Sequence, residues 1–149
     1  MLRTKLVLPE NFAFATELSI RVSDLNYGGH LGNDAVLALI HEIRIRFLKK
    51  YGFSELDIGG LGIIMVDAVI VYKSQGRLGD VITAKAAAQD FDRHGFDLYY
   101  LLLNKESDRE IARAKTGLLF FDYRLNKVAD TPAAFRELFV HESGPSACP

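Results

Sequence analysis

The chain contains very little cysteine and no long hydrophobic run. These two features argue against a disulfide-rich secreted protein and against a transmembrane protein. Its single cysteine, Cys148, can form no internal disulfide, so a reducing cytoplasm is the expected location. No segment approaches the roughly 18 uninterrupted apolar residues that a transmembrane helix needs, and the first 14 residues lack an apolar stretch of the signal-peptide type. We therefore expect a soluble, cytoplasmic protein without a membrane partner.

The chain also lacks an excess of charge of either sign. Its formal net charge is -1, which gives no electrostatic reason to expect nucleic acid or an anionic membrane as partner. His94 and His141 have no second ligand at metal spacing, so we expect no metal and no cofactor. A length of 149 residues with 49% hydrophobic and 25% charged residues fits one ordinary globular domain spanning 1–149.

Hydrophobic periodicity predicts a strand, a long helix and then four more strands. Apolar residues alternate from Phe12 to Val22, which is typical of a strand. From Val36 to Tyr51 they recur at helical spacing, which predicts a helix over 34–51 that Gly52 ends. The remaining strands are expected at 61–72, 81–91, 96–104 and 111–124, the first of them covered on both faces because it is almost wholly apolar.

A second, short helix is expected at 131–140, with Thr131 as N-cap and Pro132 at the first helical position. The residues after it, ESGPSACP, are expected to be disordered. Because short turns join consecutive strands, those strands must be antiparallel. The sequence thus predicts an α+β domain in which an antiparallel five- to six-stranded sheet wraps around one long central helix. Its core spans about residues 12–125.

The segment Asp24–Asp34, DLNYGGHLGND, is the most informative part of the chain. It places four carboxamide or carboxylate side chains, a histidine and three glycines between the first strand and the long helix. Glycines let a backbone approach a ligand closely, and a helix start offers unpaired N–H groups at the positive end of a dipole. The segment indicates a site for a polarised carbonyl or an anion. A plain turn followed by an N-cap is the alternative.

These features resemble the hotdog-fold acyl-CoA thioesterases of the 4-hydroxybenzoyl-CoA type, over about residues 12–125. That family has a D-x-D-x-x-G-H-V-N-N-like loop, where this chain has RVSDLNYGGHLGNDA. HEIRIRF matches its helical E-x-x-R-like turn, and YKSQGRLGD its later tyrosine, turn and Gly-Asp. The resemblance implies the hotdog fold and hydrolysis of an acyl-CoA or acyl-carrier thioester. It also implies a homodimer with sheets joined edge to edge and sites at the interface; a homotetramer stays open.

The chain departs from the family at the second aspartate of the loop. In many such enzymes this residue is the catalytic carboxylate, and here the position holds Asn26. An amide does not titrate near neutral pH, so Asn26 cannot act as a general base. It can still donate a hydrogen bond to a thioester oxygen or position a water molecule.

Three other side chains are candidates for the missing chemistry. Asp67 lies in the apolar segment 61–72, where burial would make a carboxylate a competent base; it can instead be paired, or face solvent at a sheet edge. Glu42 occupies a family position, although an ion pair with Arg46 four residues on is the stronger interpretation. His30 can orient a ligand or exchange a proton, or simply hydrogen-bond its own loop.

The expected substrate-binding residues surround the same loop and the later turn. Lys73 and Arg77 would meet the phosphates of coenzyme A, with solvated surface charge as the alternative. Asp24 is a candidate ligand but also a natural loop organiser. Asp34, in the first helical turn, suits the helix dipole and needs no other role. The complete set is Asp24, Tyr27, Gly28, Gly29, Asn33, Lys73 and Arg77.

Two other functions remain open at this point. Hotdog enoyl-CoA hydratases and dehydratases carry a D-x-N-P-x-H-like motif, which Asp24, Asn26 and His30 resemble without the proline and with the histidine one residue later. A non-catalytic acyl-CoA-binding protein is the third possibility, favoured by the loss of the acid at position 26. The sequence does not determine the acyl chain or its carrier.

Overall fold

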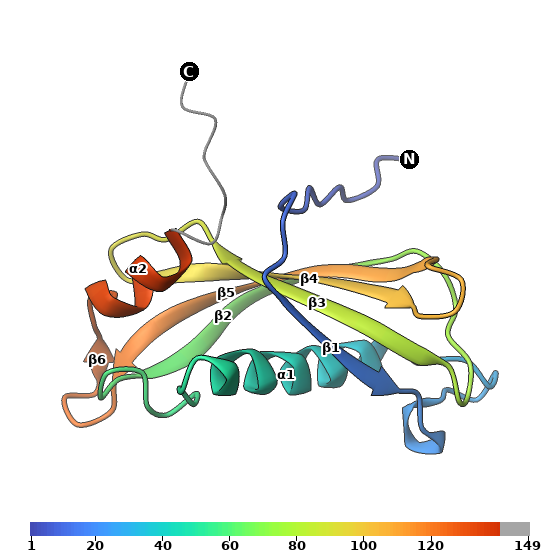
Figure 1. The fold of residues 1–149 in the computed structure, drawn as a ribbon, viewed down its shortest axis with the longest axis horizontal. Helices are drawn as coiled ribbons and strands as arrows, with labels where there is room; N and C mark the ends of the chain where they lie inside the picture. The colour runs from blue at the N-terminus through green and yellow to red at the C-terminus, as the bar shows by residue number, and fades with distance from the viewer. Residues whose placement is uncertain (141–149) are drawn as a thin grey trace.

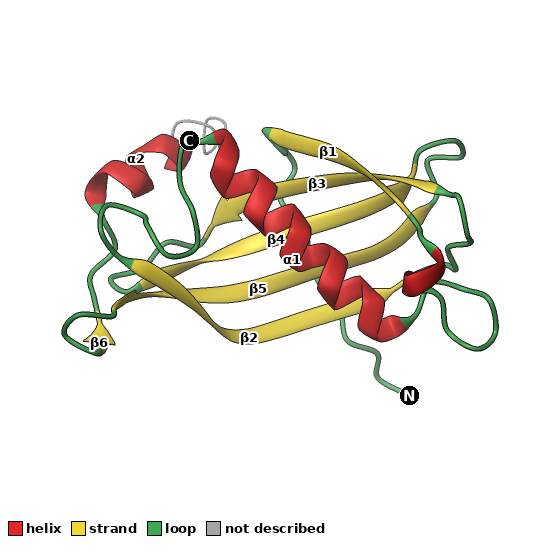
Figure 2. Ribbon diagram, turned by 90° about the horizontal axis from the view of Figure 1, so that it is seen from below, coloured by secondary structure: helices red, strands yellow, loops and turns green. Residues whose placement is uncertain are grey.

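A computed structural model of the protein, described here for residues 1–140, has one antiparallel sheet curved around a long helix (Figures 1 and 2). The sheet order is β1-β3-β4-β5-β2, and the short β6 pairs with the end of β5. The predicted arrangement is therefore confirmed. In chain order the elements are β1 (Phe14–Ser19), η1 (Val22–Asp24), α1 (Asn33–Lys50), β2 (Gly62–Tyr72), β3 (Val81–Gln89), β4 (Gly95–Asn104), β5 (Glu110–Asp122), β6 (Lys127–Val128) and α2 (Ala133–Val140).

The helix α1 crosses the concave face of the sheet diagonally (Figure 2). Its apolar stripe, which includes Ile40 and Ile43, is buried against the sheet, as the periodicity predicts. Ala84 and Ala86 of β3 are also fully buried on the face that meets the helix. Small side chains there let the helix lie close to the strands. No helix among residues 1–140 is both long enough and apolar enough to cross a membrane.

Strand β2 is an edge strand, which corrects the expectation that both of its faces are covered. It pairs only with β5, and a bulge interrupts the register between Met65 and Asp67. Met65, Val66 and Tyr72 are 44%, 53% and 47% exposed. In a single chain, the almost wholly apolar composition of this strand is thus not explained by burial within the fold. It leaves an unpaired, apolar sheet edge.

The second helix, α2, closes the far end of the sheet with aromatic side chains. Phe135 and Phe139 are almost fully buried, and their rings lie 4.9 Å apart between centroids. They join a continuous aromatic cluster under the carboxyl-terminal half of α1. The other members of this cluster are Phe14, Phe47, Tyr51, Phe53, Phe91, Phe96 and Phe120.

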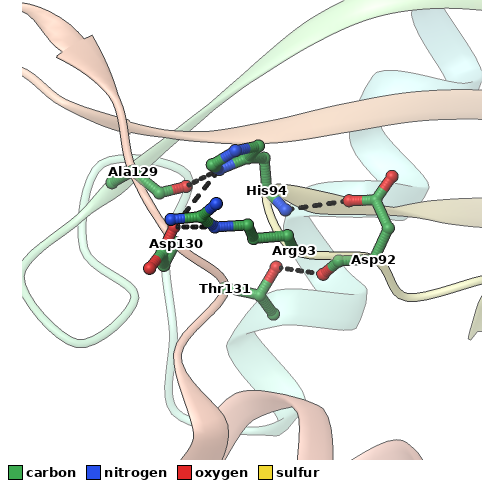
Figure 3. A network of polar contacts seen from close by, with 6 residues as sticks. All are labelled: Asp92, Arg93, His94, Ala129, Asp130 and Thr131. Carbon is green, nitrogen blue, oxygen red and sulfur yellow. Dashed lines mark hydrogen bonds and ion pairs between the residues drawn. The ribbon is translucent and has the colours of Figure 1, made fainter.

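A polar network ties the segment before α2 to the turn between β3 and β4 (Figure 3). Asp130 lies 3.2 Å from Nε of Arg93 and 3.4 Å from Nδ1 of His94. The Thr131 hydroxyl donates to the carbonyl of Asp92 at 2.9 Å. Because this hydroxyl is used in the network and α2 begins at Ala133, the prediction of Thr131 as an N-cap is wrong. The predicted tail and Cys148 lie outside the described residues.

Candidate functional site

The loop between η1 and α1 is fixed to the turn that precedes β3. The N–H of Leu31 donates to the Gly76 carbonyl at 2.8 Å, and His30 forms a backbone bridge with Arg77. A side chain at Gly76 would collide with Ile20, since its Cβ would stand 2.5 Å from Ile20 Cδ1. The glycine therefore permits the close approach that holds the loop against the turn.

A cavity of about 260 Å³ opens between this loop, the first turn of α1 and the end of β2. It brings together four of the predicted site residues, and adds Tyr72, Ser74 and Gln75 at the end of β2, which were not predicted as site residues. Leu31, Val36 and Ile111 form its apolar lining. The polar lining is Asn26, His30, Asn33, Tyr72, Lys73, Ser74 and Gln75. The polar run YKSQ directly after an apolar strand was the available signal for the missed residues.

The Asn26 side chain organises the loop with its oxygen. Its Oδ1 accepts the N–H of Gly28 at 2.9 Å and that of His30 at 3.2 Å. The N–H of Gly29 donates to the Asn26 carbonyl at 3.0 Å. The N–H groups of Gly28 and Gly29 are thus already used inside the loop. The amide nitrogen of Asn26 is left as its donor toward a ligand.

The start of α1 supplies donors that the loop does not. No side chain caps the helix at Gly32, and the first backbone hydrogen bond of the helix runs from the Val36 N–H to the Gly32 carbonyl at 3.2 Å. Within residues 1–140, the N–H groups of Asn33, Asp34 and Ala35 have no hydrogen-bond partner. Such groups carry the positive end of the helix dipole. Asn33, the first of these residues, lines the cavity.

Tyr72 joins the edge strand to this helix end. Its hydroxyl donates to the backbone carbonyl of Asn33 at 3.0 Å, and the side chain lines the cavity.

On the neighbouring strand β5, Arg113 donates twice to the Glu110 carboxylate, at 2.5 and 2.9 Å, and these bonds lower the pKa of Glu110. Arg113 also compensates the charge of Glu110. Lys73 lines the cavity and forms no ion pair within the described part of the chain, although its charge also lowers the pKa of Glu110.

Asp67 lies outside the cavity, and the expectation that it is buried is wrong. Its side chain is 59% exposed at the bulge of the edge strand. It accepts the N–H of Gly117 at 3.0 Å and lies 3.7 Å from Nζ of Lys115. The alternative of a paired aspartate at a sheet edge describes it correctly. The buried environment on which a role as general base was argued is absent.

The remaining predicted residues also lie outside the cavity lining. Glu42 faces a separate groove beside β1 and pairs with Arg46 at 3.0 Å, as its alternative interpretation predicts. Asp24 is 6% exposed and accepts the Arg21 N–H at 2.8 Å, so it organises the loop. Tyr27 is fully exposed at the loop tip. No group of three or more potential ligands in residues 1–140 could hold a metal ion.

Comparison with known proteins agrees with this arrangement. The family model of the thioesterase-like superfamily matches residues 20–139, which include the loop, α1, the whole sheet beyond β1 and most of α2. The chain belongs to the thioesterase-like superfamily. No curated protein matches it.

Solved thioesterase structures share its fold. A 1,4-dihydroxy-2-naphthoyl-CoA thioesterase from Synechocystis superposes with a TM-score of 0.78 at 21% identity, covering 89% of this chain and 98% of that one. A thioesterase superfamily protein from Jannaschia gives 0.81 at 17%, covering 91% and 86%. A hypothetical protein from Staphylococcus aureus, in complex with CoA, gives 0.77 at 13%, covering 93% and 88%. These similarities establish the hotdog fold for this member of the superfamily.

Proposed function

We propose that the cavity at the start of α1 hydrolyses the thioester of an acyl-CoA or an acyl carrier. The supporting observation is that Asn26, His30 and Asn33, the first residue of α1, line one cavity at the uncapped start of that helix in a chain of the thioesterase-like superfamily. Structural neighbours with CoA or a CoA thioester in their names add support. A free-thiol assay over aliphatic and aromatic acyl-CoAs tests the proposal.

In this proposal the thioester oxygen accepts hydrogen bonds from the first N–H groups of α1 and from the Asn26 amide. These donors are fixed before substrate arrives, so they stabilise the negative charge that develops on the oxygen. A water oxygen attacks the carbonyl carbon, the carbon–sulfur bond breaks, and the thiolate leaves and takes a proton. Lys73 at the cavity and Arg77 next to it would meet phosphates of the carrier.

In this proposal His30 donates a proton to the leaving thiolate. It lines the cavity, and histidine is the residue type that exchanges protons near neutral pH. Replacing His30 by glutamine keeps a polar side chain but removes this exchange. We expect kcat to fall by about 100-fold with KM changed by less than about threefold. Steady-state thiol release measures both constants. His94→Gln, at the α2 network, is the matched control and retains wild-type kcat; equal rates for His30→Gln and wild type would remove His30 from the mechanism.

We also propose that two copies pair through the unpaired edge of β2. The exposed Met65 and Val66 are then covered, and a symmetric pair contains two equivalent sites. Val66→Lys places a charge in this contact, so we expect a monomer by light scattering where wild type is a dimer. Val128→Lys, on β6 away from this edge, is the control and leaves the dimer intact. A monomeric wild-type protein would contradict the pairing.

Two alternatives keep a specific observation in their favour. The amide at position 26 favours a non-catalytic acyl-CoA-binding protein, which would show a thermal shift with acyl-CoA and no thiol release. The Asp24, Asn26 and His30 pattern resembles that of enoyl-CoA hydratases, although Asp24 is turned away to Arg21. Loss of the enoyl absorbance of crotonyl-CoA without free thiol would identify hydration.

A further inference from the structure

The cavity has no carboxylate in its lining, and the acids near it are already paired. Asp24 bonds the Arg21 N–H, and Glu42 pairs with Arg46. The same holds on the sheet, where Asp67 accepts a backbone N–H and lies near Lys115, and Glu110 is held by two bonds from Arg113. None of these acids is available to accept a proton from a water molecule beside Asn26.

Asp34 differs from all of them. It lies in the first turn of α1, is exposed, and has no hydrogen bond or ion pair from its carboxylate within residues 1–140. Its Oδ1 lies 2.6 Å from the point where a Cβ on Gly32 would stand. The Cβ of Asn26 lies 3.8 Å from that same point.

The Asp34 carboxylate and the Asn26 side chain therefore both lie within 4 Å of the same position, that of a Cβ on Gly32. That point is open because residue 32 is glycine; with any side chain there, the Asp34 carboxylate would have to turn away. Asn26 lines the cavity, and the Asp34 carboxylate lies next to Asn26, outside the lining itself. A carboxylate is thus present beside position 26, although it comes from the helix and not from the loop.

We propose that Asp34 is the general base of the thioester hydrolysis, in the place that a carboxylate at position 26 would otherwise fill. This inference rests on the proposed function. The Asp34 carboxylate accepts a proton from the attacking water as the water oxygen bonds to the carbonyl carbon. The carbon–sulfur bond then breaks, and the products are the free acid and the protonated thiol.

The competing explanation is that Asp34 only stabilises the helix dipole. That role predicts a small loss of thermal stability in Asp34→Asn and an unchanged pH dependence of kcat. A general base predicts something else. Its removal lowers kcat, abolishes the fall of kcat on the acid side of the pH profile, and is repaired by a carboxylate placed at position 26.

The experiment measures kcat, KM and the pH profile of thiol release for four full-length proteins: wild type, Asp34→Asn, the double variant Asn26→Asp with Asp34→Asn, and Glu106→Gln. Glu106 lies in the exposed turn between β4 and β5, so Glu106→Gln is the matched control for loss of one surface carboxylate. We expect Asp34→Asn to lower kcat by about 100-fold with little change in KM. The double variant should recover at least about tenfold over Asp34→Asn, and the control should match wild type.

The outcomes separate this inference from the proposed function. An active wild type with an unchanged Asp34→Asn variant overturns the inference alone. So does an inactive Asp34→Asn variant that the carboxylate at position 26 does not repair. A wild type that releases no thiol from any acyl-CoA overturns both proposals. Loss of the acid-side fall together with recovery in the double variant supports the inference, because a helix-stabilising role produces neither.

Discussion

Arg44→Ala is expected to lower the free energy of unfolding by about 3 kcal/mol, because it breaks an ion pair under α1. The Arg44 side chain is 9% exposed, and its Nε donates to Oε1 of Glu55 at 3.1 Å. Its Nη1 lies 3.4 Å from the Tyr100 hydroxyl, which bonds Thr116 at 2.9 Å. Burial raises the pKa of Tyr100, so this phenol stays neutral and needs its polar partners.

Urea unfolding at neutral pH measures this loss. Glu42→Ala, which removes only the ion pair of Glu42 with Arg46, is the matched control on the same helix. The Arg46 ion pair with Glu42 is exposed to solvent, and pairs of this kind contribute about 1 kcal/mol or less. A loss below about 1 kcal/mol for Arg44→Ala would show that the pair beneath α1 is no more important than a surface pair.

Phe135→Ala is expected to cost about 3–5 kcal/mol, because it leaves a cavity in the aromatic cluster that α2 closes. Phe135 is 1% exposed. Its ring centroid lies 5.0 Å from that of Phe96, 5.3 Å from that of Phe53 and 5.5 Å from that of Phe120. The residue therefore joins α2 to β4, to β5 and to the segment after α1 at once.

The control for this variant is Leu138→Ala on the same helix, where the side chain is 41% exposed and a change within about 0.5 kcal/mol is expected. Chemical denaturation followed by circular dichroism compares the two. A single transition shifted for Phe135→Ala indicates that α2 unfolds with the domain. Equal stability of the two variants would mean that α2 contributes little to the core.

The fold could be predicted because its periodic segments are long. Spacing from Val36 to Tyr51 predicts α1 to within one residue at each end, and the five longer strands appear where alternation or apolar runs predict them. Periodicity does not distinguish an apolar strand buried within the fold from one at an edge. The segment 61–72 shows this, because β2 has the composition of a buried strand and an exposed position in the single chain.

The sequence predicted several residues that line the cavity, but not their contacts. Asn26, His30, Asn33 and Lys73 lie on segments 40 residues apart and do line one cavity. Which backbone donors are free depends on the path of the loop. The Asn26 side-chain oxygen accepts the Gly28 N–H, so the free backbone donors are those at the start of α1 and not those of the loop. Similarly, the sequence spacing does not predict that the Asp34 carboxylate lies beside Gly32, because the position of that carboxylate depends on the side-chain rotamer of Asp34.

The most direct measurement of the central idea, that the head of α1 is a hydrolytic thioester site, is free-thiol release from a panel of acyl-CoAs by wild type beside His30→Gln. We expect time-dependent release with at least one acyl group, reduced by about 100-fold in the variant while binding of the same substrate persists. Absence of release across the panel would contradict it, whereas release that the His30→Gln change does not affect would remove His30 from the mechanism.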